Sequence, residues 1–269
     1  MDILKTSNQS AISSYLVEED KSVHHIETPF WNFNLALIDN VSFEYAFLTE
    51  FFSANTFHQM SRRFADIFEP TFTLGQSLTK ELIENTYDCL GILLCVRLNQ
   101  HSAFELQRRK VPVAENYING ANIILWPRFQ VVMDFHCESV RQLAATVSGR
   151  SAASKLTFTG TSSDASRQST APHFLTQRFG QFLHGILAIS YEAGDDEPVS
   201  SSLGRLRNEY EAFLLKASKG AGGDVTKRER FLGNNYALIL TIIADAEGKL
   251  AQEQKKHFED LRQALGDQR

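Results

Sequence analysis

Helical periodicity is the feature of this sequence that most restricts its fold. Apolar residues recur at spacings of three and four along most of the chain, whereas the alternating pattern of strands is scarce. Only six prolines occur in 269 residues. One stretch has the heptad spacing of helices that pack side by side, formed by Leu203, Leu206, Tyr210, Phe213 and Ala217. The pattern predicts an all-α fold of about seven or eight long helices, arranged in bundles.

The expected start of the first helix is a capping residue, either Asp39 or Asn40. The apolar face of this helix is predicted to carry Phe43, Phe47, Leu48, Phe51 and Phe52. A second helix is expected to begin near Asn55. Pro70 should kink or interrupt that helix, because proline removes a backbone hydrogen bond and crowds the preceding turn.

The middle of the chain predicts a central helix. The middle of the segment 85–109, from Cys89 to Val96, is apolar almost all round, which is typical of a buried helix. Pro112 suits the first turn of the next helix, and that helix is predicted to pass through Pro127 with a bend to about residue 143. After a Ser/Thr-rich stretch, helical periodicity returns in four segments, 174–191, 203–217, 226–246 and 247–265.

Composition divides the chain into four predicted parts. Residues 1–28 are polar and Ser-rich, and we expect a mobile tail. Residues 29–145 should form a first helical bundle. Residues 146–172 carry few large apolar groups and predict a flexible Ser/Thr-rich loop. Residues 173–269 should form a second helical bundle.

Charge and hydropathy exclude several function classes. The net charge is −5 with a pI of about 5.9, whereas nucleic-acid binders present a strongly basic face. The apolar runs are much shorter than the roughly 20 residues of a membrane span. The N-terminus lacks the basic start and apolar middle of a signal peptide. The three cysteines are widely spread and suit a reducing compartment. We therefore expect a cytosolic protein or one on the cytosolic face of a membrane.

No motif in the sequence predicts a catalytic, cofactor or metal site. The string "DFHCE" (134–138) holds four potential metal ligands, but on a helix Asp134 and Glu138 share a face while His136 and Cys137 point elsewhere. An ordinary helix surface is the favoured interpretation. The string "KGAGGDVTK" lacks the spacing of a phosphate loop and predicts a flexible turn.

Two adjacent amides, Asn234 and Asn235, stand out in the apolar stretch "RERFLGNNYALILTII" (228–243). If the stretch is helical, Asn235 shares a stripe with Leu232 and Ile239, where a polar residue costs stability but selects register. The alternative is that both amides bond to nearby backbone close to the helix start. Burial and hydrogen bonding of Asn235 are predicted, and its replacement by leucine is expected to preserve or raise thermal stability.

Five segments of the chain, taken in order, resemble a known family. They are "NFNLALIDNVSFEYAFLTEFF" (32–52), "YDCLGILLCVRL" (87–98), "LWPRFQVVMD" (125–134), "PHFLTQRFGQF" (172–182) and "FLGNNYALIL" (231–240). Together they resemble the C-terminal half of the fifty-two subunit of the Golgi-associated retrograde protein complex, GARP, whose endosomal sister is EARP. The resemblance runs from about Phe33 to Leu265. It implies a C-terminal fragment without the family's N-terminal coiled-coil half, and with the family's extreme C-terminus absent.

The resemblance also implies a fold and a function. The implied fold is a tethering-complex rod, an elongated stack of antiparallel helical bundles. The implied function is non-enzymatic capture of endosome-derived vesicles at the trans-Golgi network, as a peripheral protein of trans-Golgi and endosomal membranes. The implied partners are the other complex subunits, SNAREs and a Golgi Rab-type small GTPase in its GTP form. The rival interpretations are a generic helical adaptor and a helical enzyme with a site in the bundle core.

Two stretches could supply the GTPase-binding surface. In one, Arg62 and Arg63 flank a Phe-rich stripe, and in the other Arg205 and Arg207 flank the heptad stripe. A small GTPase typically meets one or two helices that offer apolar groups with a charged rim. The alternative is that both stripes are internal core and the arginines are merely solvated.

Overall fold

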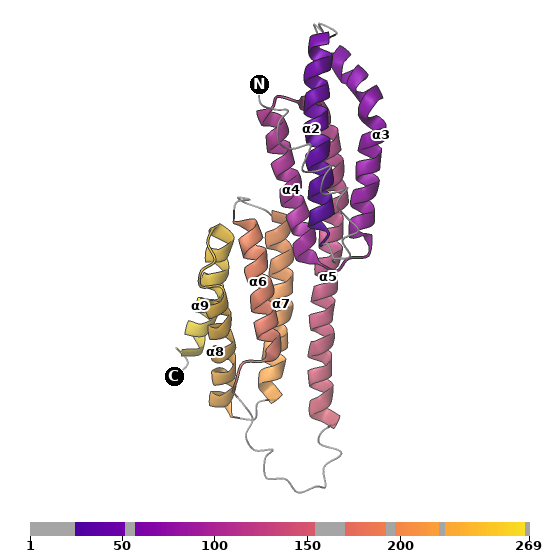
Figure 1. Cartoon of the computed structure of the whole chain (residues 1–269). Helices are drawn as coiled ribbons and strands as arrows, with labels where there is room; N and C mark the ends of the chain where they lie inside the picture. Colours follow the sequence, from indigo (N-terminus) through magenta and orange to yellow (C-terminus); the bar gives the residue numbers. More distant parts are fainter. Residues whose placement is uncertain (1–24, 52–56, 154–169, 192–196, 221–223, 267–269) are drawn as a thin grey trace. The chain divides into compact units, whose positions relative to one another are not determined.

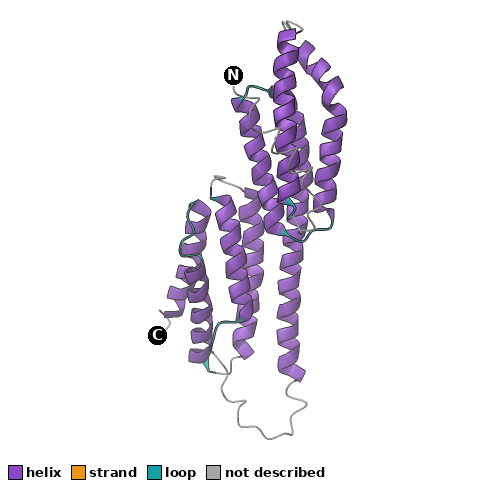
Figure 2. Ribbon diagram, viewed as in Figure 1, coloured by secondary structure: helices purple, strands orange, loops and turns teal. Residues whose placement is uncertain are grey.

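The computed structural model describes residues 25–51, 57–153, 170–191, 197–220 and 224–266 (Figure 1). Within these ranges the chain is helical with short connecting loops (Figure 2), and no strand occurs in them, which confirms the all-α prediction. The elements are α2 (Glu27–Phe51), α3 (Phe57–Glu84), α4 (Cys89–Arg108), the 3-10 helix η1 (Pro112–Ala114), α5 (Glu115–Ala153), α6 (Phe174–Ser190), α7 (Glu197–Gly220), α8 (Val225–Ile242) and α9 (Lys249–Gly266).

The chain forms two compact units, Met1–Phe129 and Gln130–Arg269, and α5 contributes to both. In the first unit, α2 packs against α3 and α4. α4 begins at a side-chain cap, because the Asp88 carboxylate accepts a hydrogen bond from the backbone N–H of Gly91 at 3.0 Å. Ile92, Leu93 and Val96 are fully buried, so α4 is the central helix that its all-round apolar sequence predicts.

An aromatic column fills the core between α3 and the start of α5 in the first unit. Phe64, Phe68 and Phe72 are buried one turn apart along α3, and Phe72 stacks on Tyr117 with ring centroids 5.1 Å apart. The Tyr117 hydroxyl donates to the side-chain oxygen of buried Asn34 on α2 at 2.8 Å. Because the Tyr117 hydroxyl has a hydrogen-bond partner, burial of the ring leaves no unpaired polar group at this position.

The second unit packs α6, α8 and α9 against one another, and α7 packs against α8. Its core is again aromatic: Phe179 of α6 and Tyr210 of α7 stack nearly parallel at 4.2 Å. Phe213 of α7 and Phe258 of α9 are fully buried. The polar terminal segment predicted as an exposed helix is α9, which is anchored by this one buried phenylalanine and by Ala251.

The predicted start of the first helix is wrong. α2 begins at Glu27, and Asp39 and Asn40 lie inside it. The Asn40 amide donates to the backbone oxygen of Ala36 one turn earlier at 2.8 Å, and Asp39 pairs at 2.7 Å with Arg109, the C-cap residue of α4. The predicted tail, residues 1–28, therefore overlaps the first turn of α2, and its first 24 residues lie outside the described ranges.

The predicted apolar face of this helix is also wrong in its orientation. The buried residues of α2 include Phe30, Ile38 and Val41, whereas Phe43 and Phe47 are exposed. Leu48 is buried as predicted, and Phe52 lies outside the described residues. The inner face of α2 follows Phe30, Ile38 and Val41, and the phenylalanines at spacing four fall on its outer side.

Both internal prolines lie within continuous helix. α5 passes through Pro127, which confirms that the helix spans this proline. α3 passes through Pro70 without interruption, so of the predicted kink or interruption the interruption is wrong. α5 also continues to Ala153, beyond the predicted start of the Ser/Thr-rich loop at 146, and residues 154–169 of that loop lie outside the described ranges.

Candidate interaction surfaces

The first pair of predicted partner-binding residues, Arg62 and Arg63, is exposed on α3. The phenylalanines of this stretch point the other way: Phe64 and Phe68 are buried and stack at 4.4 Å. Ile67, one turn after Arg63, is exposed. The buried rings of Phe64 and Phe68 therefore belong to the core, and α3 offers outward arginines beside exposed Ile67.

The structure separates the second pair, Arg205 and Arg207, although both lie on α7. Arg205 faces α5, where its guanidinium pairs with Asp134 at 2.5 Å. Arg207 faces α9, donates to the side-chain oxygen of Gln254 at 3.1 Å and is only 20% exposed. Arg207 thus helps to hold α7 against α9, whereas Arg205 borders an open surface.

That surface is a groove between α5 and α7, within the second unit, with a volume of about 630 Å³. Half-exposed Phe135 and Val131 supply its apolar part. The Arg205–Asp134 pair and the Arg141–Glu209 pair, at 2.6 Å, bridge the two helices. The full lining of this α5–α7 groove is Val131, Asp134, Phe135, Cys137, Glu138, Arg141, Arg205, Asn208 and Glu209. Apolar groups thus lie within a rim of both charge signs.

The string "DFHCE" belongs to this groove and uses each potential metal ligand separately. Asp134 pairs with Arg205, and Glu138 pairs with Arg141 at 2.7 Å. His136 packs against Phe182, with ring centroids 5.2 Å apart. Burial raises the pKa of the Cys137 thiol. No group of three metal-ligating side chains occurs in the part of the chain that the structure describes.

Asn235 joins α8 to the start of α6 through a buried polar network. Its side-chain oxygen accepts hydrogen bonds from the backbone N–H of His173, at 2.9 Å, and from the Thr176 hydroxyl. Its amide donates to the backbone oxygen of Phe231 at 2.7 Å. The Tyr210 hydroxyl donates to Thr176 at 2.9 Å and completes the network. Asn235 is fully buried, as the apolar stripe of its helix predicts.

Both interpretations of the paired asparagines hold in part. Asn235 bonds to nearby backbone at Phe231 and also crosses to a neighbouring helix, which fixes the register of α8 against α6. Asn234 is exposed, and its amide donates to the backbone oxygen of Thr170 at 2.7 Å, in the segment that leads into α6. Both amides thus attach α8 to the same approach to α6.

His173 makes the stability of the second unit depend on pH. Its ring nitrogen Nδ1 caps α6 by accepting a hydrogen bond from the Leu175 N–H at 3.1 Å, and burial against Phe213 lowers its pKa. The unfolded chain, with an ordinary histidine pKa of about 6.5, therefore takes up a proton that the folded chain resists. We expect the melting temperature to be constant above about pH 7.5 and to fall as the pH drops below about 6.5.

The measurement is the melting temperature of wild type and His173→Asn between pH 5.5 and about pH 8. Asparagine keeps an N-cap acceptor without titrating, so the variant should show a shallower fall. Some slope should remain, because burial also lowers the pKa of His136. An identical pH profile for the two proteins would contradict this assignment.

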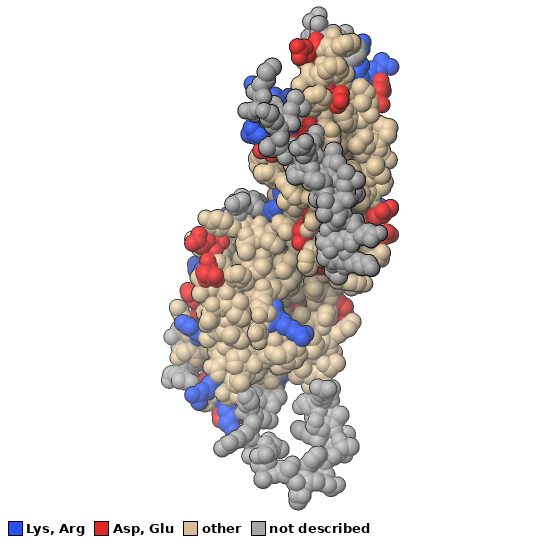
Figure 3. Space-filling model, in the orientation of Figure 1, with Lys and Arg blue, Asp and Glu red and all other residues tan. Residues whose placement is uncertain are grey.

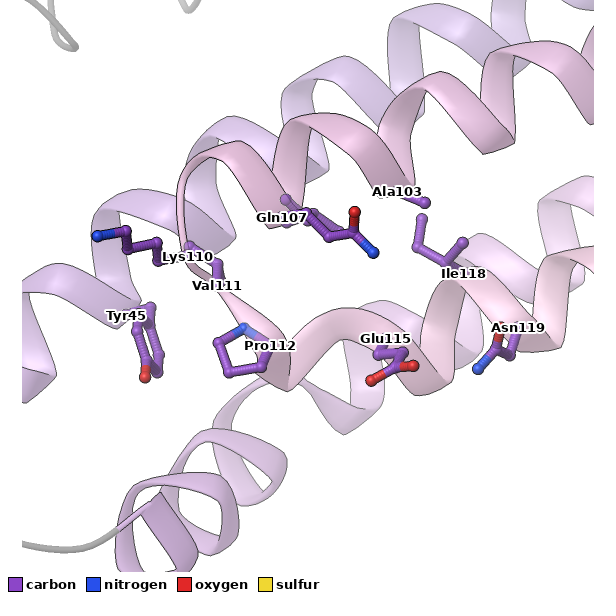
Figure 4. A pocket seen from close by; sticks show the side chains of 10 residues that line it. Tyr45, Ala103, Gln107, Lys110, Val111, Pro112, Glu115, Ile118 and Asn119 are labelled. Atoms are coloured by element: carbon purple, nitrogen blue, oxygen red, sulfur yellow. The ribbon is translucent and has the colours of Figure 1, made fainter. Parts of the chain in front are cut away.

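A second groove, in the first unit, was not anticipated from the sequence. It has a volume of about 530 Å³ and lies where α4, η1 and α5 meet, with Tyr45 of α2 on one side. Figure 4 shows Lys110 and Tyr45 at one end and Asn119 at the other, with Gln107 between them. Lys110 has a left-handed backbone, with φ of 59°, because the chain turns sharply there before Pro112. The sequence signal for this sharp turn was a lysine that follows a helix end and stands two residues before a proline.

The described helices and one face of the molecule can be compared with the requirements of a membrane span and of a basic binding surface. None of the described helices is long and apolar enough to cross a bilayer. On the face drawn in Figure 3, lysines and arginines lie scattered among uncharged and acidic side chains.

The chain is similar to a family of known proteins over nearly its whole length. The family model described as "Vps52, C-terminal" matches residues 1–267. The chain is 35% identical over 258 residues to vacuolar protein sorting-associated protein 52 of Schizosaccharomyces pombe, covering 96% of this chain and 47% of that protein. It is 36% identical over 248 residues to the protein of the same name from Saccharomyces cerevisiae, covering 89% of this chain and 37% of that protein.

The human homologue is 26% identical over 246 residues, which cover 89% of this chain and 30% of that protein. The chain thus spans about half or less of the length of these curated relatives. No solved structure matches the chain.

Proposed function

The chain belongs to the Vps52 family, of which it carries the C-terminal region, and from this premise we propose that it is a non-enzymatic part of a multisubunit vesicle-tethering complex. The complex acts in endosome-to-trans-Golgi retrograde transport, on the cytosolic face of trans-Golgi and endosomal membranes. The work of this part is binding. Its partners are the other subunits, SNAREs and a Golgi Rab-type small GTPase in its GTP form.

The observation that carries the GTPase proposal is the α5–α7 groove. The switch surface of a small GTPase binds helix pairs that present apolar side chains within a charged rim. The groove supplies half-exposed Phe135 and Val131, and ion pairs of Arg205 and Arg141 surround them. The α3 surface around Arg62 and Arg63 is the second candidate. Its arginines point outward, but it carries less exposed apolar surface than the groove.

The test is binding of the chain to an immobilised Golgi Rab-type GTPase loaded with GTP or with GDP. We expect preference for the GTP form. Arg205→Glu should weaken binding by about tenfold or more, because it breaks the pair with Asp134 and reverses the rim charge at the groove. Lys227→Glu, the same charge reversal at an exposed position of α8 in the same unit, is the matched control.

The outcomes separate the surface from the partner. If Arg62→Glu with Arg63→Glu weakens binding and Arg205→Glu does not, the binding surface lies on α3. If wild type binds both nucleotide forms equally or neither at micromolar concentration, the GTPase is not a partner. If Arg205→Glu also lowers the melting temperature, it cannot locate the surface, and Asn208→Arg takes its place because Asn208 lines the same groove.

A further inference from the structure

A row of exposed phenylalanines runs along the outer side of α2. Phe43, Phe47 and Phe51 are spaced four residues apart, so they lie on one side of the helix one turn from each other. They are 44%, 50% and 67% exposed. The rings of Phe47 and Phe51 stack at 5.7 Å, nearly parallel. We call Phe43, Phe47 and Phe51 the α2 phenylalanine row.

The row lies opposite the face by which α2 joins the first unit. The buried residues Leu37, Val41 and Leu48 meet α3 and α4 on the inner side. Solvent-exposed single apolar residues are ordinary, but three large aromatic rings in line are typical of a protein-binding face. Phenylalanine is also enriched at the centres of protein interfaces.

The charges that α2 itself places beside the row are acidic. Glu44 precedes Phe47 by three residues and Glu50 follows it by three, so each lies next to Phe47 on the helix surface. α2 contains Glu27, Asp39, Glu44 and Glu50 and neither lysine nor arginine along its length. Asp39 is already paired with Arg109, which leaves Glu44 and Glu50 as the carboxylates beside the row.

From this arrangement we propose that the α2 phenylalanine row docks a basic amphipathic helix of another polypeptide. Its apolar face would cover Phe43 and Phe47, and its lysines or arginines would pair with Glu44 and Glu50. The row spans about 12 Å along the helix axis, which corresponds to two turns, so a partner segment of about three turns covers it. Two helices meet by such i, i+4 ridges packing into each other's grooves.

The same charges argue against a membrane as the occupant. Cytosolic leaflets are anionic and attract basic amphipathic helices, whereas Glu44 and Glu50 would be pressed against lipid phosphates. A second copy of α2 is disfavoured for the same reason, because two acidic rims would face each other. The proposal does not depend on the GTPase, because the α2 phenylalanine row and the α5–α7 groove belong to different units.

The probe is an 18-residue synthetic helix with leucines at spacings of three and four and lysines on the flanking positions. A second peptide carries glutamate at every lysine position. The whole chain is titrated with each labelled peptide, and anisotropy is recorded at low and at physiological salt. We expect the lysine peptide to bind at least about tenfold more tightly than the glutamate peptide, with the difference shrinking as salt rises.

Two variants locate the site. Phe43→Ala with Phe47→Ala should weaken binding of the lysine peptide by about tenfold or more, since central aromatic residues carry most of the binding energy of an interface. The control, Phe104→Ala, removes an exposed phenylalanine of α4 in the same unit and should leave binding unchanged. Glu44→Lys with Glu50→Lys should reverse the preference toward the glutamate peptide.

Several results would overturn the proposal. They are equal binding of both peptides, unchanged lysine-peptide binding in the double alanine variant, and weakening by Phe104→Ala to the same extent. Flotation with phosphatidylserine vesicles that the double alanine variant abolishes would assign the row to a membrane. Self-association in sedimentation that the same variant abolishes would assign it to a second copy. Because the replaced rings are exposed, we expect each alanine variant to keep the melting temperature of wild type. This measurement checks that the variants fold.

Discussion

Replacing Asn235 with leucine is expected to lower the free energy of unfolding by about 2–4 kcal/mol. The replacement removes the acceptor for the His173 N–H and the Thr176 hydroxyl and the donor to the Phe231 oxygen. Each of these partners then loses a hydrogen bond in a buried or half-buried place, and an unsatisfied buried group costs about 1–3 kcal/mol. The expectation is the reverse of the one that the apolar stripe of α8 alone suggests, because the stripe does not reveal what the amide contacts.

Urea denaturation of wild type and variant, followed by circular dichroism, measures this difference. The matched control is Asn234→Leu, the adjacent residue in the same helix. Asn234 is exposed, and its bond to the Thr170 oxygen can be replaced by water, so we expect a loss of about 1 kcal/mol or less. Equal losses at the two positions, or a more stable Asn235→Leu variant, would show that the network contributes nothing to stability.

Replacing Arg109 with methionine should destabilise the first unit by about 2–3 kcal/mol. Arg109 joins the end of α4 to the middle of α2, through Asp39 at 2.7 Å and the Ser42 hydroxyl at 3.3 Å. The side chain of Asp39 is only 10% exposed and that of Arg109 only 20%. Methionine has a similar length but leaves the Asp39 carboxylate poorly solvated and without a cation, and this charge accounts for most of the cost.

A second substitution tests that cause. The double variant Arg109→Met, Asp39→Leu removes the stranded carboxylate as well, so it should recover much of the lost stability. The neighbour Arg108 is the control: it is 70% exposed and pairs with Glu105 on the surface. Arg108→Met should leave the melting temperature unchanged, because exposed ion pairs contribute little. A double variant less stable than Arg109→Met alone would contradict the account.

Helix content was predictable because its signals are local. Spacings of three and four select helices, and the all-round apolar middle of the segment 85–109 predicted the central position of α4. Pro112 predicted a helix start shortly after the end of a buried helix, which is where η1 begins. The burial of Asn235 was also predictable, since its neighbours Leu232 and Ile239 define an apolar stripe.

The candidate surfaces were predictable only in part. Two arginines that flank one heptad stripe, Arg205 and Arg207, appear equivalent in sequence. They differ in structure because residues two positions apart project from different sides of a helix. One therefore meets Asp134 of α5 and the other Gln254 of α9. No local pattern identifies these partners, because they lie 71 and 47 residues away along the chain.

The sequence by itself determined that this protein is helical, which segments are most buried and which family it resembles, because periodicity and family motifs are properties of the chain. The tertiary structure decided which of two apolar stripes on α2 turns inward. Val41 and Leu48 lie inward, and the phenylalanines at 43, 47 and 51 lie outward. The two stripes have the same spacing in the sequence. The choice between them depends on the aromatic column of α3 and the Arg109–Asp39 pair, which form only when segments distant in sequence pack together.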